Sequence, residues 1–312
     1  DVKKMATREG YGRGLVALGA AHEDVVVLDA DLAGSTKTGM FAKAYPDRHF
    51  NCGIAEADMM CVAAGFAANG FVPFASSFAM FAAGRAFEQI RNSVAYPHLN
   101  VKIAATHAGI TVGEDGATHQ CLEDIALMRV LPGMTVISPA DAVEAVAALK
   151  AALEMAGPCY LRFGRYAVPV LHDPDTYRFE IGKGEVLRDG SDVTIVANGI
   201  LVSMALTAAD TLAAEGISAR VINIHTVKPL DTELLCAAAA ETGAVVTAEE
   251  HNIIGGLGSA VAETLAENCP VPMVRVGVRD SFGRSGKVPE LLALYGLTPE
   301  ALCDAACRAV AA

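Results

Sequence analysis

The sequence predicts an α/β fold of two domains, in which mostly parallel sheets are covered by helices. Its 312 residues are too many for one ordinary core. Short β-branched runs alternate with longer helical patterns along the whole chain, and the alternation is interrupted once, near residues 172–184. Alternating strands and helices favour parallel sheets with both faces covered.

Buried strands are expected at short apolar runs, each separated from the next by a helical pattern. The helix expected over residues 56–69 places Met59, Val62, Ala63 and Phe66 on one face. A second helix carries Val202, Ala205, Leu206, Ala209 and Leu212 in the same way. The expected strands are residues 25–28, 101–105, 135–137, 159–162, 193–197, 219–224, 245–248 and 273–276.

The interruption gives the domain boundaries. At residues 172–184, Asp-Pro-Asp, Gly-Lys-Gly and several charged residues break the apolar pattern. We therefore expect one domain at 1–171, a linker at 172–184 and a smaller second domain at 185–312.

Composition and charge exclude several classes of partner. The net charge is −12 and no basic run occurs, so neither nucleic acid nor an anionic membrane surface is expected. No run of apolar residues is long enough for a transmembrane segment. The hydrophobic fraction of 53% instead indicates a surface buried against another subunit. Eight cysteines without a CxxC pair predict reduced, buried thiols in a cytoplasmic protein.

Glu56 is the first candidate for chemistry. It ends the segment Asn51-Cys52-Gly53-Ile54-Ala55-Glu56 and stands where a helix is expected to begin. A carboxylate in a first helical turn commonly compensates the helix dipole, so its position alone favours that structural role over a catalytic one.

The stretch THAGITVGEDGATHQ at residues 106–120 is the second candidate. It follows a buried strand and contains His107, Glu114, Asp115 and His119 among three glycines. Loops at the carboxyl ends of parallel strands bind ligands in α/β proteins. No HxH or HxxxH spacing supports a metal site, so no metal ligands are predicted. A solvated loop remains the alternative.

Two further segments are weaker candidates. Phe78 and Phe81 stand three apart, and aromatic residues at that spacing share a helix face and usually fill a core. The segment Gly255-Gly256-Leu257-Gly258 opens a helix and could cradle a phosphate. It lacks GxGxxG spacing and a Walker lysine, so a tight turn is expected there.

In this order, the segments resemble the second half of transketolases. The resemblance covers nearly the whole chain and implies a thiamine-diphosphate pyrimidine-binding domain followed by a transketolase C-terminal domain. The matching segments are ATREGYG at 6–12, LDADLAGSTKT at 28–38, NCGIAEADM at 51–59, THAGITVGEDGATHQ at 106–120 and FGRSGKVPE at 282–290.

The resemblance implies a cofactor site on this chain. Glu56 corresponds to the catalytic glutamate that hydrogen-bonds a ring nitrogen of the aminopyrimidine of thiamine diphosphate. Phe78 and Phe81 match the aromatic wall against that ring, which reverses the reading from spacing alone. Gly84 stands where the family often has a further aromatic residue, and Asp31 matches an acidic residue close to the cofactor.

A substrate site is implied in the same way. His107, Asp115 and His119 match residues that bind the hydroxyls and the phosphate end of the sugar, and both histidines are expected to be catalytic. At the mouth of the substrate channel, guanidinium groups would grip the 5-phosphate. The matching residues there are Arg8, Ser35 and Arg165.

One motif of the family is missing from the sequence. The Gly-Asp-Gly…Asn motif, which binds Mg²⁺ and the diphosphate, belongs to the amino-terminal domain of transketolases and is not found here. The resemblance therefore implies the carboxyl-terminal subunit of a split enzyme, inactive alone. An N-terminal subunit would supply the Mg²⁺ ligands in an α2β2 assembly. The implied reaction transfers a two-carbon ketol unit from xylulose 5-phosphate to ribose 5-phosphate, in the pentose phosphate pathway.

Three alternatives remain. The beta subunit of a 2-oxoacid dehydrogenase lacks the GEDGATHQ pattern with two substrate histidines. Deoxyxylulose-phosphate synthase has a similar loop, but it is a single chain and usually has Arg where His107 stands. A non-catalytic assembly subunit is disfavoured because Glu56, His107, Asp115, His119 and Arg165 are all retained.

Overall fold

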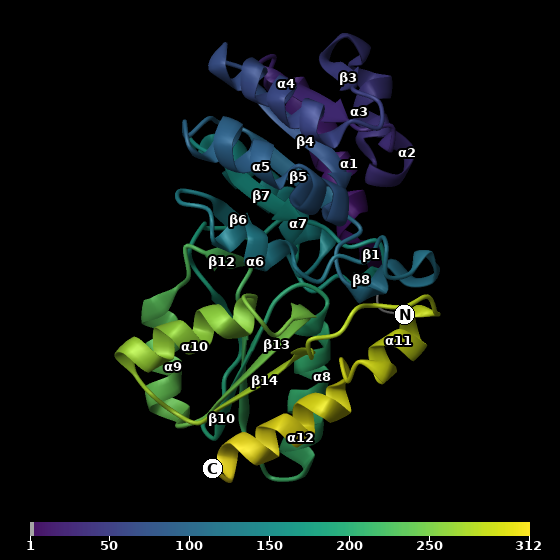
Figure 1. The fold of residues 1–312 in the computed structure, drawn as a ribbon. Helices are drawn as coiled ribbons and strands as arrows, with labels where there is room; N and C mark the ends of the chain where they lie inside the picture. The colour runs from purple at the N-terminus through teal and green to yellow at the C-terminus, as the bar shows by residue number, and fades with distance from the viewer. Residues whose placement is uncertain (1–2) are drawn as a thin grey trace.

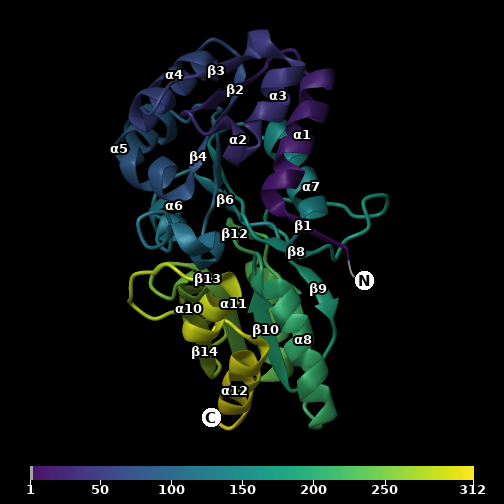
Figure 2. The ribbon, with the colours of Figure 1, turned by 90° about the vertical axis from the view of Figure 1, so that its right-hand side faces the viewer.

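A computed structural model describes residues 3–312 as two α/β sandwiches, one above the other in Figure 1. The first is built on a seven-stranded sheet in the order β12-β6-β7-β5-β4-β2-β3, and the second on a five-stranded sheet in the order β14-β13-β10-β11-β9. A two-stranded sheet of β1 (Lys4–Ala6) and β8 (Ala167–Pro169) lies near their junction (Figure 2). The predicted fold class is confirmed.

The first sheet is parallel except at β12, which pairs antiparallel with β6. Four of its strands fall where apolar runs predict them. The prediction misses β4 because Pro73, Ser76 and Ser77 interrupt its apolar run, although the whole strand is buried. The strands are β2 (Val25–Asp29), β3 (His49–Asn51), β4 (Val72–Phe78), β5 (Lys102–Thr106), β6 (Thr135–Ile137), β7 (Cys159–Arg162) and β12 (Thr226–Lys228).

Helices cover both faces of this sheet. Alternate residues of β2 show the two faces: Val25 and Val27 pack toward α1, α3 and α7, whereas Val26 and Leu28 pack toward α4. The predicted helix at 56–69 is confirmed as α4. The helical elements are α1 (Thr7–Ala21), α2 (Ala33–Thr36), α3 (Thr38–Ala44), α4 (Glu56–Ala68), the π-helical turns Met80–Arg85 and Ile90–Ala95 around α5 (Phe87–Gln89), α6 (Asp124–Arg129) and α7 (Ala142–Glu154).

The second sheet is parallel except at β9, which runs antiparallel to β11. Helices α8 and α12 pack in one hydrophobic cluster together with residues of the second sheet. Helices α9 and α10 pack in a different hydrophobic cluster. Its strands are β9 (Glu185–Arg188), β10 (Val193–Ala197), β11 (Ala219–Asn223), β13 (Val245–Asn252) and β14 (Met273–Val278). Its helices are α8 (Leu201–Ala214), α9 (Thr232–Thr242), α10 (Leu257–Asn268), α11 (Val288–Leu294) and α12 (Pro299–Val310).

The two sandwiches are joined by shared structure. Residues 170–184 contain neither helix nor strand, but β12 crosses from the second half of the chain and extends the first sheet. One hydrophobic cluster contains Leu131 of the first sandwich together with Leu235 and Leu257 of the second. A continuous core of this kind makes the relative placement of the sandwiches part of the fold.

The composition predicts that the chain has no membrane-spanning helix and that its thiols are reduced and buried. Within residues 3–312, no helix is both long and apolar enough to cross a membrane. All eight cysteines are unpaired, as expected. The prediction that the thiols are buried is confirmed only for Cys121 and Cys159. Cys61 and Cys307 are exposed, and the other four cysteines are partly exposed.

Candidate active site

Glu56 lies in a buried position at the start of α4. The chain turns from β3 into α4 through Gly53, whose φ of +70° suits glycine. The Glu56 side chain is 2% exposed, and its two carboxylate oxygens accept hydrogen bonds from Nη1 of Arg85 at 3.0 and 3.1 Å. Compensation of the helix dipole needs only a surface carboxylate. Burial of Glu56 therefore requires a further reason.

Two phenylalanines stand beside this carboxylate. Phe78 is the last residue of β4 and Phe81 lies in the following π-helical turn, so the expectation that they share a helix face is wrong. Their rings are 5.9 Å apart and nearly parallel, at 20°. The guanidinium of Arg85 lies over the ring of Phe81 at 4.8 Å. Beside Gly84, the tip of Met80 occupies the space that a β-carbon would enter.

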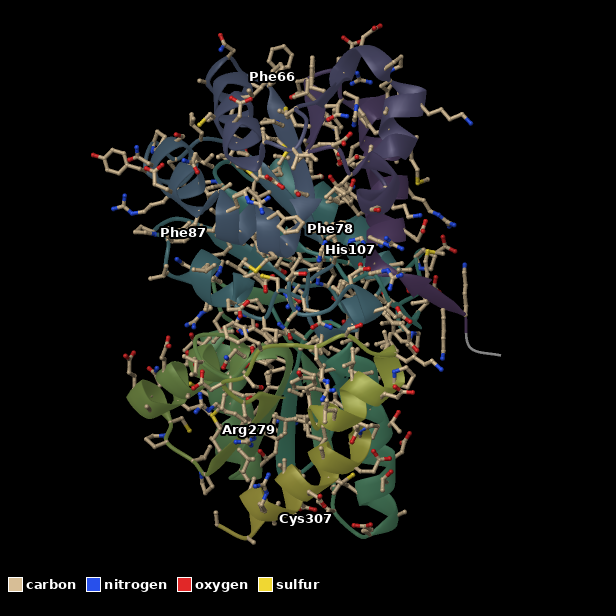
Figure 3. All side chains as sticks on the ribbon, turned by 45° about the vertical axis from the view of Figure 1, so that its right-hand side comes forward. Phe66, Phe78, Phe87, His107, Arg279 and Cys307 are labelled. Atoms are coloured by element: carbon tan, nitrogen blue, oxygen red, sulfur yellow. The ribbon has the colours of Figure 1, made fainter. Side chains whose placement is uncertain are left out.

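The two histidines of the 106–120 loop contact the same phenylalanines. The His107 ring stacks on Phe78 with centroids 3.8 Å apart, as Figure 3 shows. The His119 ring meets Phe81 edge-on at 5.4 Å and 73°. His107 also has a φ of +56°, a left-handed conformation that a non-glycine residue adopts only where its surroundings enforce it.

The contacts of His107 show which of its two ring nitrogens carries the proton. Nη1 of Arg8 lies 3.2 Å from Nε2 of His107, and Oγ1 of Thr106 lies 2.9 Å from Nδ1. Because arginine only donates, Nε2 is an acceptor, and Nδ1 carries the proton and donates to Thr106. Burial, together with Arg8, Arg165 and other nearby cations, lowers the pKa of His107 to about 3. The ring is therefore neutral at physiological pH.

Cationic groups gather beside His107 in a chain of net charge −12. Arg8 donates from Nη1 to the carbonyl of Ser35 at 2.9 Å, and its buried Nε has no hydrogen-bond partner within residues 3–312. Burial and the nearby charge of Arg165 lower the pKa of Arg8. Arg165 itself donates to the carbonyl of Val112 at 2.8 Å. An unused buried guanidinium donor on Arg8, close to the charge of Arg165, suits an anionic ligand.

Two of the predicted residues lie at the margin of this cluster. Asp31 is exposed, with a φ of +61°, and its Oδ1 accepts a hydrogen bond from Nδ2 of Asn51 at 3.2 Å. Asp115 is exposed at the end of the 3-10 turn Ile110–Asp115. The structure thus brings together Phe78, Phe81, His107, His119, Arg8 and Ser35 through direct contacts, and Arg85 joins Glu56 to this cluster.

The 106–120 loop rests on the second sandwich. The backbone N–H of Thr111 donates to Oε1 of Glu250 at 2.6 Å. Gly109, at a φ of +84°, lies so close that a β-carbon there would be 2.2 Å from the Glu250 carboxyl carbon. Nε2 of Gln120 donates to the carbonyl of Arg284 at 3.0 Å. Two glutamates directly after the apolar run at 245–248 are the sequence signal for this contact.

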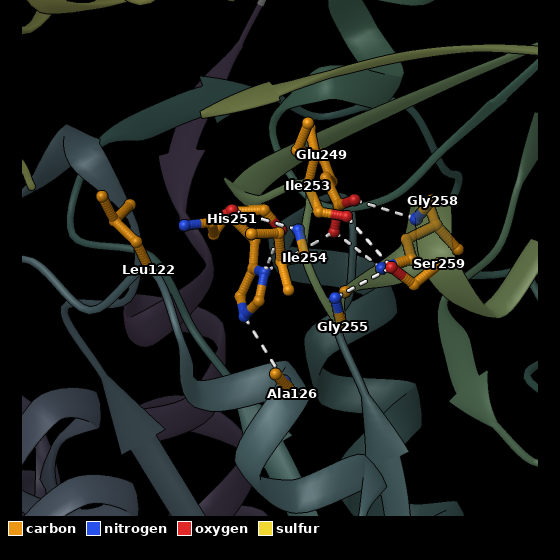
Figure 4. Close-up of polar contacts among 12 residues, drawn as sticks. Leu122, Ala126, Glu249, His251, Ile253, Ile254, Gly255, Gly258 and Ser259 are labelled. Carbon is orange, nitrogen blue, oxygen red and sulfur yellow. Dashed lines mark hydrogen bonds and ion pairs between the residues drawn. The ribbon is translucent and has the colours of Figure 1, made fainter. Parts of the chain in front are cut away.

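Further buried polar groups surround Glu250. Arg162 pairs with Asp124 at 2.8 Å and also donates to the Glu250 carbonyl at 2.9 Å. Glu249 accepts hydrogen bonds from the backbone N–H groups of Leu257 and Gly258 at 2.6 and 2.8 Å (Figure 4). The start of α10 is therefore occupied by the chain's own carboxylate, in agreement with the tight turn expected at residues 255–258.

Comparison with known proteins gives the family of both halves of the chain. The family described as "Transketolase, pyrimidine binding domain" matches residues 3–170, and "Transketolase, C-terminal domain" matches residues 182–302.

Three individual proteins illustrate the similarity. The 6-deoxy-6-sulfo-D-fructose transketolase subunit SqwH of Clostridium sp. (strain MSTE9) is 46% identical, over 96% of this chain and 92% of that protein. The transketolase of Homo sapiens is 36% identical, over 97% of this chain but 48% of its own length. A solved structure described as "Split gene transketolase, inactive beta4 tetramer" is 56% identical with a TM-score of 0.91, over 99% of both chains.

Proposed function

The chain belongs to the transketolase family, and we propose that it is the subunit of a split transketolase that binds the pyrimidine half of thiamine diphosphate. Its two domains match 48% of the length of the human enzyme. A relative of matching length is itself named a transketolase subunit. The observation that carries the proposal is the buried Glu56 carboxylate, bonded to a flat cation stacked on Phe81.

The groups around Glu56 fit an aminopyrimidine. The guanidinium of Arg85 is planar and donates N–H to Glu56 while it lies on Phe81, so this space admits a flat ring whose nitrogen faces the carboxylate. When bound, thiamine diphosphate supplies an acidic carbon that, once deprotonated, adds to a ketose carbonyl. Glu56 would hold a proton at the ring nitrogen, and its burial would exclude water from that hydrogen bond. Asp31 would stand near the cofactor at the edge of this space.

The groups around His107 fit a sugar phosphate. Neutral His107 has Nε2 as its acceptor, which would receive a hydrogen bond from a substrate hydroxyl once Arg8 turns from it toward the phosphate. His119 and Asp115 would bind the remaining hydroxyls from the same loop. The free Nε of Arg8 supports binding of the phosphate, with Arg165 and Ser35 beside it.

A partner subunit would complete the site. Among residues 3–312, one grouping has the side chains of a metal site, namely Glu144, His172 and Glu185. His172 there is already hydrogen-bonded to Asp141 and Glu185 at 3.0 and 2.9 Å. We therefore assign the Mg²⁺ and diphosphate ligands to an N-terminal subunit in an α2β2 assembly. The similar solved structure, described as an inactive tetramer, supports this dependence.

For the reaction, we propose ketol transfer from xylulose 5-phosphate to ribose 5-phosphate, as in the pentose phosphate pathway. The test combines the purified chain with its N-terminal partner, thiamine diphosphate and Mg²⁺. Transfer is expected only when both subunits are present. The donor panel includes 6-deoxy-6-sulfofructose, the sugar in the name of the SqwH subunit.

Other outcomes of this assay favour the alternatives. Consumption of pyruvate indicates a 2-oxoacid dehydrogenase or a deoxyxylulose-phosphate synthase activity. Ketol transfer by the chain alone refutes the need for a partner. An assembly that forms but turns over none of these substrates indicates a non-catalytic subunit.

A further inference from the structure

We infer that Arg85 occupies the position of the cofactor's pyrimidine ring in the free subunit and must leave it before the cofactor binds. The inference rests on the proposed function. Its basis is the coincidence of two contacts. Arg85 donates to both oxygens of Glu56 from one nitrogen, at 3.0 and 3.1 Å, and its guanidinium lies 4.8 Å over the face of Phe81.

These two contacts are the ones that an aminopyrimidine would make. A guanidinium group is flat, stacks on aromatic rings and donates N–H to a carboxylate. The proposed cofactor ring is also flat, would stack on the same phenylalanine and would share a proton with the same carboxylate. Glu56 is 2% exposed, so its oxygens lack space for a second ring-sized partner. Arg85 and the pyrimidine therefore compete for one place.

The Arg85 side chain is free to leave. It is 54% exposed, and its hydrogen bonds within residues 3–312 are the two to Glu56. It stands at the end of the π-helical turn Met80–Arg85, a type of turn often found at functional sites. The neighbouring Gly84 has no side chain that would hold the guanidinium in place. Rotation of the side chain toward solvent breaks only these contacts and the stacking on Phe81.

The competition has a consequence for the assembled enzyme. Arg85 supplies a partner for the buried Glu56 carboxylate, whose charge would otherwise be unpaired. Displacement of Arg85 must be offset by the cofactor, which lowers the observed cofactor affinity. A half-exposed ion pair with a cation–π contact corresponds to a factor of about three to ten. The diphosphate contacts of the partner subunit would then decide whether the cofactor binds.

Calorimetric titration of thiamine diphosphate into the assembled apoenzyme tests this inference. We expect Arg85→Ala to lower the dissociation constant about three- to tenfold. Arg85→Lys keeps the charge without the planar group, so we expect an intermediate value. Arg91→Ala, an exposed arginine outside the site, is the matched control and should equal the wild type.

The outcomes separate this inference from the proposed function. A wild-type assembly that binds the cofactor, together with an Arg85→Ala assembly that binds it no more tightly, overturns the inference alone. A wild-type assembly that binds no thiamine diphosphate overturns both. Melting temperatures of the apo assemblies show whether Arg85→Ala is folded. If it is not, the Arg85→Lys titration decides, because equal affinity in Arg85→Lys and wild type also overturns the inference.

Discussion

The two sides of the 106–120 loop are built in different ways. On the side toward α4, Glu56 is paired with Arg85, which is 54% exposed and lies over the ring of Phe81. On the side toward the second sandwich, the carboxylate of Glu250 is 5% exposed and binds the backbone of the loop itself. Side-chain contacts with an exposed partner exchange easily, whereas buried contacts to backbone fix a conformation.

This difference gives the second sandwich a role in the site. Its buried groups hold the loop that carries His107 and His119, and contribute no side chain to the aromatic cluster. The first sandwich provides the side chains that we propose to react, and Arg85, the partner of Glu56, remains half-exposed. We therefore expect substitutions on the junction side to change stability and loop geometry. Substitutions on the Glu56 side should change cofactor binding and turnover.

The largest effect on stability is expected at the buried ion pair of the junction. Arg162→Met leaves Asp124 buried and unpaired, which should destabilise the fold by about 3–5 kcal/mol. The control is Arg220→Met, because Arg220 pairs with exposed Asp189 and Glu241 and should cost at most about 1 kcal/mol. Urea unfolding measures both. Equal losses would contradict the assignment of the junction as the rigid side.

A second effect is expected at His172, which joins Asp141 of the first sandwich to Glu185 of the second. Burial alone would lower the pKa of His172, but these two carboxylates outweigh burial and raise the pKa to about 10. The stability that His172 contributes is therefore present in full below its unfolded pKa of about 6.5, and is lost as the pH rises through 10.

The measurement compares wild type with His172→Gln in urea from pH 6 to pH 10. At pH 6, wild type should be more stable by roughly 1.5–3 kcal/mol, the usual contribution of hydrogen bonds to charged groups. This difference should shrink toward pH 10. A constant difference over that range would show that the charge of His172 does not join the sandwiches.

A smaller effect is expected at Glu250. Glu250→Ala leaves the backbone N–H of Thr111 without an acceptor, at a cost of about 1–3 kcal/mol. The KM for the sugar phosphate should rise in the assembled enzyme, because the loop carries the two histidines. Glu250→Gln retains an acceptor oxygen and should restore most of both losses. If glutamine behaves like alanine, the hydrogen bond to Thr111 does not position the loop.

The sequence predicts the parts of this fold that depend on local pattern. Strands β2, β5 and β10 are mostly apolar runs, so their burial is predictable without a structure. Strand β12 has three residues, and only its position against β6 makes it a strand. Its membership of the first sheet is a tertiary property that a local pattern does not contain.

The candidate site divides in the same way. The motifs that contain Glu56, His107 and His119 resemble those of a family, and this resemblance predicts their roles. Their spacing alone specifies no role. Contact partners do not follow from spacing, because Arg85 is 29 residues from Glu56, and Glu250 is 139 residues from Thr111 in the histidine loop. The motifs lie in contiguous segments, whereas these contacts form only when distant loops meet.

We propose above all that Glu56 activates thiamine diphosphate, which this chain would bind jointly with a partner subunit. The most direct test of this proposal is the ketol-transfer rate of Glu56→Gln and Glu56→Ala chains, each assembled with the N-terminal subunit and saturated with thiamine diphosphate and Mg²⁺. We expect folded assemblies whose kcat is reduced by a factor of about 10²–10⁴, the usual contribution of a positioned proton-transfer group. Rates within about threefold of wild type would contradict the proposal.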